Sequence, residues 1–529
     1  MVFQGVRQVK GWKSLGYSLV ILYIALFGVM HAVHLSADFP HSTAWPDWAK
    51  YTDEGYWGKA AVHSHLFGDW YVPGDFNPAP AVPVLPSLEW ILFYVTGVSI
   101  QAARGLAVFL FFVNLLLVYR LLCVRWPPWT GLLAIAILVS SPFLYCFSRL
   151  AILEPLLLTL TLSAMNLILH LNKYRRQGLA AAALGFLFTL MFLTKTNAIF
   201  FLPALVWMIV VPLRHERRQL YRILLWAGCT SAASLAVWMS LIVVKGYYND
   251  FKYLFTINVY EKPHGFVERT VSLIIPWYRC LSADFLLVPL TFALVLGVFI
   301  NRRNKWSEDL PFDPLFGGSL LMALGCIGFM TYQNNASPRY CVVADFFLTL
   351  VLAQIVAKLV HQNGGARKIG ALVSAFIALA VVQNSFQVTQ YLLRPQYTFV
   401  DATRHLTQYI DQHPNGNRVL SFASADDITL MTGLNAISDV FGTQDLPDKL
   451  MRYRPGWYAT WNLDPRILAK IHVHYSLEQV AVFPAFGDRE MKEIRLFKLH
   501  ALPNGQSRSP NKMNLAIPLP DDQMNLPGQ

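Results

Sequence analysis

Apolar stretches of about 20 residues recur along this chain, and short clusters of Lys and Arg separate them. A helix needs about 20 apolar residues to cross a hydrocarbon core roughly 30 Å thick. The composition agrees, since 55% of the 529 residues are hydrophobic and only 14% are charged. We therefore predict an all-α polytopic membrane protein with eleven transmembrane helices. They lie near residues 15–34, 100–122, 128–147, 152–171, 178–194, 197–213, 221–244, 283–301, 314–332, 340–361 and 369–390.

The basic clusters all fall on one side of the membrane when eleven helices are counted. The apolar stretch 85–97 is too short to span, so we predict an interfacial helix there. Because Lys and Arg concentrate in cytoplasmic loops, we expect a cytoplasmic N-terminus and a location in the plasma (inner) membrane. Basic residues before the first apolar stretch, with no cleavage site after it, indicate an uncleaved signal anchor. The segments 35–99, 245–282 and 391–529 are then extracytoplasmic.

The chain changes character after residue 390, where the membrane domain 1–390 is predicted to end. Short alternating runs at 418–422, 480–483 and 494–499 follow a polar helical pattern at 399–410. These patterns predict a small extracytoplasmic α/β domain over 391–502. Residues 503–529 are rich in Asn, Pro, Ser and Gln and are predicted to be disordered. The net charge of +12 is dispersed between apolar runs, so we predict membrane lipids and no nucleic acid as partners.

An adjacent carboxylate pair, Asp53-Glu54, follows the first apolar stretch on the predicted outer side. One interpretation is structural: Thr52 or Asp53 caps a helix that runs to about residue 67, and Glu54 complements the helix dipole. The other is catalytic: one carboxylate deprotonates an acceptor while its neighbour orients it or binds a cation. The sequence alone leaves both open.

Six further residues lie at outer ends of the predicted spans. Glu154 precedes Pro155 at the start of a helix, and Arg149 pairs either with Glu154 or with a phosphate. Lys195 and Arg339 place positive charge on the outer face, against the usual bias, and so require an anionic partner. Tyr340 adds a hydroxyl donor, and Asp345 is an alternative partner for Arg339. Ionisable residues gathered at one depth indicate a functional site.

Metal ligation has little support in the sequence. His63 and His65 are two residues apart and do not share a helix face, and the six Cys show no metal-binding spacing. We predict no metal site from these residues. The cofactor requirement stays unknown, because the carboxylates leave a divalent cation open.

The order of these residues resembles the GT-C superfamily of glycosyltransferases. The most similar branch contains the dolichyl-phosphate-mannose protein mannosyltransferases and the bacterial lipid A aminoarabinose transferases. The resemblance spans roughly residues 15–390. It is carried by Asp53-Glu54-x-Tyr56, Gly68-Asp69-Trp70-Tyr71-Val72-Pro73, Ala103-Arg104, Ser148-Arg149-x4-Glu154-Pro155, Leu193-Thr194-Lys195-Thr196 and Pro338-Arg339-Tyr340.

The resemblance implies an inverting transfer of a sugar from a polyprenyl-phosphate carrier to a lipid, glycan or protein acceptor at the outer membrane face. Asp53, Glu54 and Glu154 would then be the catalytic carboxylates. Arg149, Lys195, Arg339 and Tyr340 would bind the donor phosphate. The segments 53–67 and 85–97 resemble the two juxtamembrane helices of the first outer loop in this family.

Two departures from the family pattern limit what can be transferred. Relatives commonly carry a Lys-Pro pair before the second juxtamembrane helix, whereas residues 77–83 contain no Lys. Other cations must then bind the phosphate. The candidate cations are Arg149, Lys245, Lys262, Arg269, Arg279 and Arg339. The second departure is Tyr56, which stands where the aminoarabinose branch has Arg, so the sugar of that branch cannot be assumed for this chain.

Two other functions remain compatible with the sequence. A transporter or flippase of lipid-linked saccharides would use the same cations to guide a phosphate headgroup. It would also need polar residues in span centres, where few are found. A non-catalytic assembly or sensor protein would instead act through residues 391–529.

Overall fold

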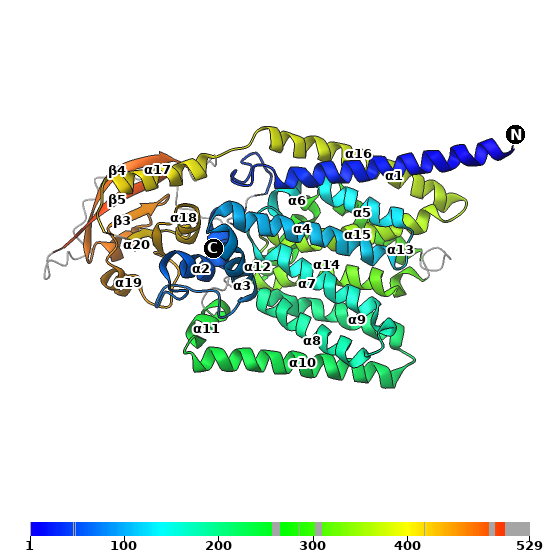
Figure 1. The fold of residues 1–529 in the computed structure, drawn as a ribbon, viewed down its shortest axis with the longest axis horizontal. Helices are drawn as coiled ribbons and strands as arrows, with labels where there is room; N and C mark the ends of the chain where they lie inside the picture. Colours follow the sequence, from blue (N-terminus) through cyan, green and yellow to red (C-terminus); the bar gives the residue numbers. More distant parts are fainter. Residues whose placement is uncertain are drawn as a thin grey trace.

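The computed structural model describes residues 2–45, 47, 49–256, 265–284, 286–301, 309–416, 418–485 and 492–502, with the backbone alone for residues 2–14 and 172. The predicted tail 503–529, the basic cluster at 302–305 and Lys262 lie outside these residues. The described chain consists of a helical bundle with a small α/β domain at one end (Figure 1).

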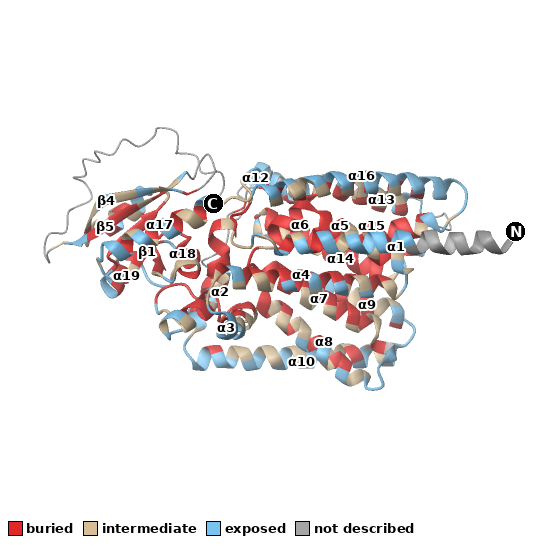
Figure 2. Ribbon diagram, turned by 45° about the horizontal axis from the view of Figure 1, so that its top comes forward, coloured by how far each residue is buried: buried red, intermediate tan, exposed pale blue. Residues whose placement is uncertain are grey.

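Long apolar helices build the bundle, and among the described residues eight segments are long and apolar enough to cross a membrane. Figure 2 shows buried residues along α14 and α15 and exposed residues along α10 and α16, which lie at the periphery. The protein is therefore an integral membrane protein with α15 at its centre. The bundle helices are α1 (Val2–Ala32), α4 (Ile100–Cys123), α5 (Pro128–Ser140), α6 (Pro142–Phe147), α7 (Leu153–Leu169), α8 (Gln177–Thr194), α9 (Leu202–Leu213), α10 (Arg217–Val244), α13 (Leu287–Ile300), α14 (Pro314–Gln333), α15 (Cys341–Val360) and α16 (Gly365–Leu393).

Each of the eleven predicted spans coincides with a helix or a pair of helices, while their number stays a prediction. The segment 128–147 differs from expectation because it is two helices. Ser141 accepts a hydrogen bond from the amide of Leu144 at 3.2 Å, and Pro142 has no amide hydrogen to continue α5. Four short 3₁₀ helices complete the bundle: η1 (Leu171–Lys173), η2 (Thr196–Phe201), η3 (Leu310–Phe312) and η4 (Pro338–Tyr340).

Two helices of the first outer loop pack together at the end of the bundle nearest the α/β domain (Figure 1). They are α2 (Ala49–Phe67) and α3 (Val84–Thr96), which correspond to the two predicted juxtamembrane helices. The expected outer segment 245–282 holds α11 (Tyr248–Thr256) and α12 (Gly265–Ala283). Loops from distant parts of the chain thus gather at one end of the bundle.

The segment after α16 folds as the α/β domain that the alternating pattern predicts. Its five strands have the order β2-β1-β3-β5-β4, with β2, β1 and β3 parallel and β5 antiparallel to both β3 and β4. In register, Leu420 of β1 lies between Ile437 and Tyr458. The elements are α17 (Thr398–Gln412), β1 (Arg418–Ser421), α18 (Ala425–Thr432), β2 (Asn435–Ser438), α19 (Leu446–Tyr453), β3 (Trp457–Thr460), α20 (Pro465–Ile471), β4 (Tyr475–Pro484) and β5 (Glu493–Ala501).

The first outer loop holds this domain against the bundle. Asp38 accepts hydrogen bonds from the amides of Phe399 and Val400 at 2.8 and 3.3 Å. The loop carboxylate therefore satisfies free amides in the first turn of α17. Burial raises the pKa of Asp38 to about 6 despite these hydrogen bonds.

Candidate functional site

Asp53 lies inside α2 and faces the junction between the outer loops. The helix begins at Ala49, so the expectation that Thr52 or Asp53 caps it is wrong. Asp47 instead accepts a hydrogen bond from the amide of Ala49 at 2.9 Å. The carboxylate of Asp53 accepts from the indole of Trp57 at 3.1 Å, one helical turn later, and lies mostly buried. Its side chain is therefore held in one orientation by its own helix.

Arg339 of η4 is the cation nearest to Asp53, with its Nε 3.5 Å from Asp53 Oδ2. Its main partner is Asp47, which accepts from the Arg339 side chain at 2.6 Å and from its amide at 2.9 Å. The alternative that Arg339 pairs with Asp345 is wrong. Pro338 begins η4 and turns the chain before α15, which presents Arg339 at the outer end of the bundle.

Lys195 links two more helices to this cluster. It occupies the extended residue between α8 and η2, and its ammonium group forms a buried ion pair with Glu154 in the first turn of α7. The same ammonium group lies 4.2 Å from the centre of the Tyr340 ring. A cation over an aromatic face is attracted by the ring quadrupole. Lys195 therefore has the anionic partner that its outer position required, and it also contacts an aromatic ring.

These contacts form one continuous chain from α2 to α7. Asp53 contacts Arg339, the Arg339 guanidinium lies 5.2 Å from the centre of the Tyr340 ring, and Tyr340 contacts Lys195, which pairs with Glu154. Five predicted site residues from four separate segments thus meet at one end of the bundle. We call these five residues the outer cluster.

Glu54 points to a different neighbour from Asp53. Both of its carboxylate oxygens accept hydrogen bonds from Arg104 of α4, at 2.7 and 2.5 Å, and one also accepts from the amide of Ala151 at 2.9 Å. Arg104 donates further to the carbonyl of Leu35 at 2.8 Å. A fully buried carboxylate with this many donors joins α2 to α4 and to the segment before α7.

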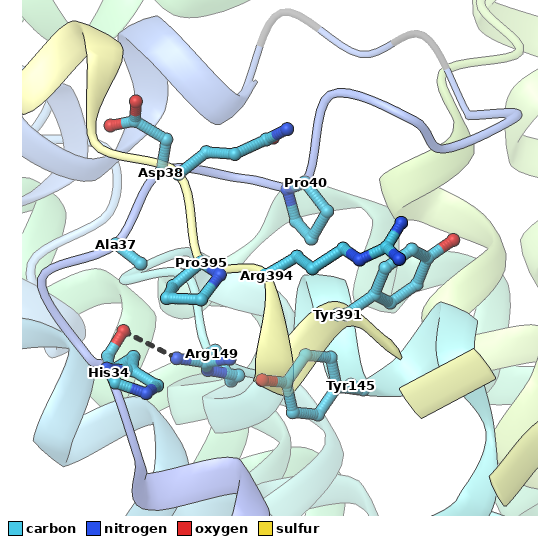
Figure 3. A pocket seen from close by; sticks show the side chains of 10 residues that line it. His34, Ala37, Asp38, Pro40, Tyr145, Arg149, Tyr391, Arg394 and Pro395 are labelled. Atoms are coloured by element: carbon cyan, nitrogen blue, oxygen red, sulfur yellow. Dashed lines mark hydrogen bonds between the residues drawn. The ribbon is translucent and has the colours of Figure 1, made fainter. Parts of the chain in front are cut away.

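Arg149 is placed apart from the outer cluster. Its guanidinium donates to the carbonyls of Val33 and His34 at 2.6 and 2.7 Å and stacks on the ring of Tyr145 (Figure 3). The alternative that Arg149 pairs with Glu154 is wrong, since Glu154 pairs with Lys195. Arg149 lines a small pocket with Asp38, Tyr391 and Arg394 (Figure 3). The other candidate cations that the structure describes, Lys245, Arg269 and Arg279, lie on or near the surface.

A second buried ionic group, which the sequence analysis did not identify, joins α2 to the α/β domain. Lys59 of α2 pairs with Asp75 at 2.5 Å and with Asp426 of α18 at 3.0 Å, and Lys449 of α19 pairs with Asp75 at 2.6 Å. We call these four residues the α2 anchor. Burial alone would raise the pKa of Asp75, but Lys59 and Lys449 outweigh burial and lower it.

The sequence gives no signal for the α2 anchor beyond the charge of Lys59 itself, in a helix that also carries Lys50, Asp53 and Glu54. No local pattern indicates partners more than 360 residues away. In the part of the chain that the structure describes, no group of three or more His, Cys, Asp or Glu residues is arranged to hold a metal ion.

Comparisons with known proteins bear on the fold of this chain. The model of the dolichyl-phosphate-mannose-protein mannosyltransferase family matches residues 78–243. The crystal structure of ArnT from Cupriavidus metallidurans bound to undecaprenyl phosphate is similar, with a TM-score of 0.57 and 14% identity over 91% of this chain and 98% of that one. This chain has a GT-C fold. The apo structure of the same ArnT matches with a TM-score of 0.54 and 13% identity over the same shares of the two chains.

The comparisons confirm the GT-C resemblance on which the predicted fold class rested. The proteins to which this chain is similar are glycosyltransferases. No curated protein matches the chain in sequence. The roles of individual residues therefore rest on the geometry of the outer cluster.

Proposed function

We propose that this protein transfers a sugar from a polyprenyl-phosphate carrier to an acceptor at the outer face of the plasma (inner) membrane, with inversion at the anomeric carbon. The observation that carries the proposal is the outer cluster, in which the Asp53 carboxylate lies beside Arg339 and is joined through the Tyr340 ring to a second cation, Lys195, at one end of a membrane bundle. The match to an ArnT structure that contains undecaprenyl phosphate supports a donor of this class. With a cytoplasmic N-terminus, this end of the bundle is extracytoplasmic.

Asp53 acts as the general base in this proposal. The acceptor, a lipid, glycan or protein group, loses its proton to Asp53 and attacks the anomeric carbon. The new bond forms as the bond from that carbon to the phosphate oxygen breaks. The electron pair of the broken bond leaves with the polyprenyl phosphate. One displacement from the face opposite the leaving group inverts the configuration. Glu54 holds α2 in place through Arg104 while Asp53 reacts.

Lys195, Arg339 and Tyr340 stabilise the leaving phosphate in this proposal. Both cations already have acidic partners, Glu154 and Asp47, so the donor phosphate must share or replace these contacts. The site holds three carboxylates, Asp47, Asp53 and Glu154, and two cations, so its formal net charge is −1. The cations are Arg339 and Lys195. An anionic donor therefore needs at least one further cation. The described candidates are Arg279, Lys245 and Arg269, while Arg149 lines the separate pocket of Figure 3.

The test begins with the lipid that co-purifies with the protein, identified by mass spectrometry. Purified protein in liposomes is then given a panel of synthetic undecaprenyl-phosphate hexoses and pentoses together with a membrane extract as acceptor. Release of undecaprenyl phosphate measures transfer. We expect Asp53→Asn to lower the rate by about 100-fold or more, because a positioned base contributes on the order of 10² to 10⁴.

Asp69→Asn is the matched control, because Asp69 is an exposed carboxylate in the same outer loop. It should keep the wild-type rate. Equal rates for Asp53→Asn and wild type would refute the assigned base. Movement of the intact donor across the liposome membrane without release of undecaprenyl phosphate would favour a transporter instead.

A further inference from the structure

We infer that the α/β domain is part of the transfer machinery because Asp427 of α18 positions the helix that carries Asp53. Asp427 is a positioning residue in this inference and does not touch the substrate. The inference rests on the proposed role of Asp53 as the base. It concerns the carboxylate of Asp427, the amide of Gly55 and the packing of α18 against α2.

The first contact is a hydrogen bond between two distant parts of the chain. The amide of Gly55 donates to Oδ1 of Asp427, and Asp427 is fully buried. Gly55 follows Asp53 by two residues on the same helix. A shift of α2 at Gly55 therefore moves the Asp53 carboxylate relative to Arg339. Arg339 is held by Asp47, which lies before the start of α2, so a shift at Gly55 acts on Asp53 more directly than on Arg339.

The second contact is a close approach of two backbones. A Cβ atom added at Gly55 would lie 2.1 Å from the carbonyl carbon and oxygen of Asp426. No side chain fits in that space, so α18 packs directly on the backbone of α2. Any other residue at position 55 would push the α/β domain away from the helix or displace the helix itself.

The α2 anchor fastens the same interface one turn further along. Lys59 contacts both Asp75 and Asp426, and Lys449 contacts Asp75, the carbonyl of Ser438 at 2.5 Å and that of Phe441 at 2.7 Å. Ser438 ends β2, and α18 follows β1. The interface thus occupies the carboxyl ends of parallel strands, where α/β sheets bind their ligands. Here α2 of the membrane domain fills that place.

Two substitutions of Asp427 can distinguish a role of its hydrogen bond to Gly55 from a role of its negative charge. Burial and the charge of Glu54 raise the pKa of Asp427 well above its ordinary value. An Asn side chain has the shape of the protonated carboxyl group and keeps an oxygen that accepts from Gly55. Asp427→Asn should therefore preserve the contact, whereas Asp427→Ala should remove it.

The experiment measures donor-dependent kinetics and the hydrogen exchange of α2 residues 49–67 in the full-length protein. We expect Asp427→Ala to lower kcat by about 10- to 100-fold with little change in the donor KM, because small misplacements of a catalytic group carry losses of this size. Exchange of residues 49–67 should become faster. Asp427→Asn should restore both kcat and slow exchange. Asp401→Ala, an exposed carboxylate of α17, is the control and should match wild type.

Gly55→Ala is the second variant, because it removes no functional group and favours a helix more than Gly does. It should lower kcat as Asp427→Ala does. Wild-type kcat in Asp427→Ala or in Gly55→Ala would overturn the inference, and so would equal losses in Asp427→Asn and Asp427→Ala. If the wild type transfers no sugar, the proposed function fails, while the exchange contrast between the two Asp427 variants still tests the contact.

Discussion

The ion pair between Glu54 and Arg104 yields the most exact test of how α2 is held. We replace each residue by Met, alone and together, which keeps side-chain length and removes the charge. Both residues are at most 3% exposed, and two hydrogen bonds of 2.7 and 2.5 Å join them. Removing one partner of a buried pair leaves an uncompensated charge and costs about 3–5 kcal/mol.

The double variant should be far less unstable than the sum of the two single variants. Both charges are then absent, and the remaining cost is the loss of the donors to the carbonyls of Leu35 and Ala37 and of the acceptor for the amide of Ala151, about 1–3 kcal/mol for each group left unsatisfied. We expect the loss in free energy of unfolding in the double variant to be about 2–3 kcal/mol smaller than the sum of the losses in the two single variants. A coupling of this size is typical of residues in direct contact.

The assay is reversible unfolding in mixed detergent micelles, followed by tryptophan fluorescence, for the wild type and the three variants. Additive losses would refute the pairing of Glu54 with Arg104.

Transfer activity distinguishes the role of Glu54 from that of Asp53. The double variant should keep measurable turnover, since Glu54 supports α2 and Asp53 reacts. Complete loss of turnover in a folded double variant would show that Glu54 itself takes part in the reaction.

Two predictions concern the α/β domain. Asp38→Ala should cost about 1–2 kcal/mol and speed hydrogen exchange at the start of α17, since it removes a capping carboxylate; unchanged exchange would contradict the capping role. Burial raises the pKa of Asp439 to about 7, so the folded state keeps a proton that the unfolded state loses above about pH 4. The domain should therefore lose up to about 4 kcal/mol as pH rises from about 4 to 7. Asp439→Asn should flatten this dependence in thermal unfolding measured at pH 5 and 8, and an unchanged pH slope would contradict it.

The site could be predicted in part because the ends of the apolar stretches indicate the depth of nearby residues in the membrane. Asp53, Glu154, Lys195, Arg339 and Tyr340 all lie at predicted outer ends of apolar helices, and the structure brings them together. Their partners could not be predicted. Arg339 pairs with Asp47, 292 residues earlier, and not with the nearby Asp345. Arg149 pairs with main-chain carbonyls, which carry no mark in the sequence.

The sequence by itself determined the membrane helices and the α/β character of the last segment, because hydrophobic length and alternation act locally and are independent of distant contacts. It also determined on which side of the bundle the ionisable residues gather. Only the tertiary structure decided which charges pair, that Glu54 is held by Arg104, and that α18 rests on Gly55. Ion pairs and close backbone contacts depend on distances of a few ångströms between segments hundreds of residues apart, and those distances exist only in the packed molecule.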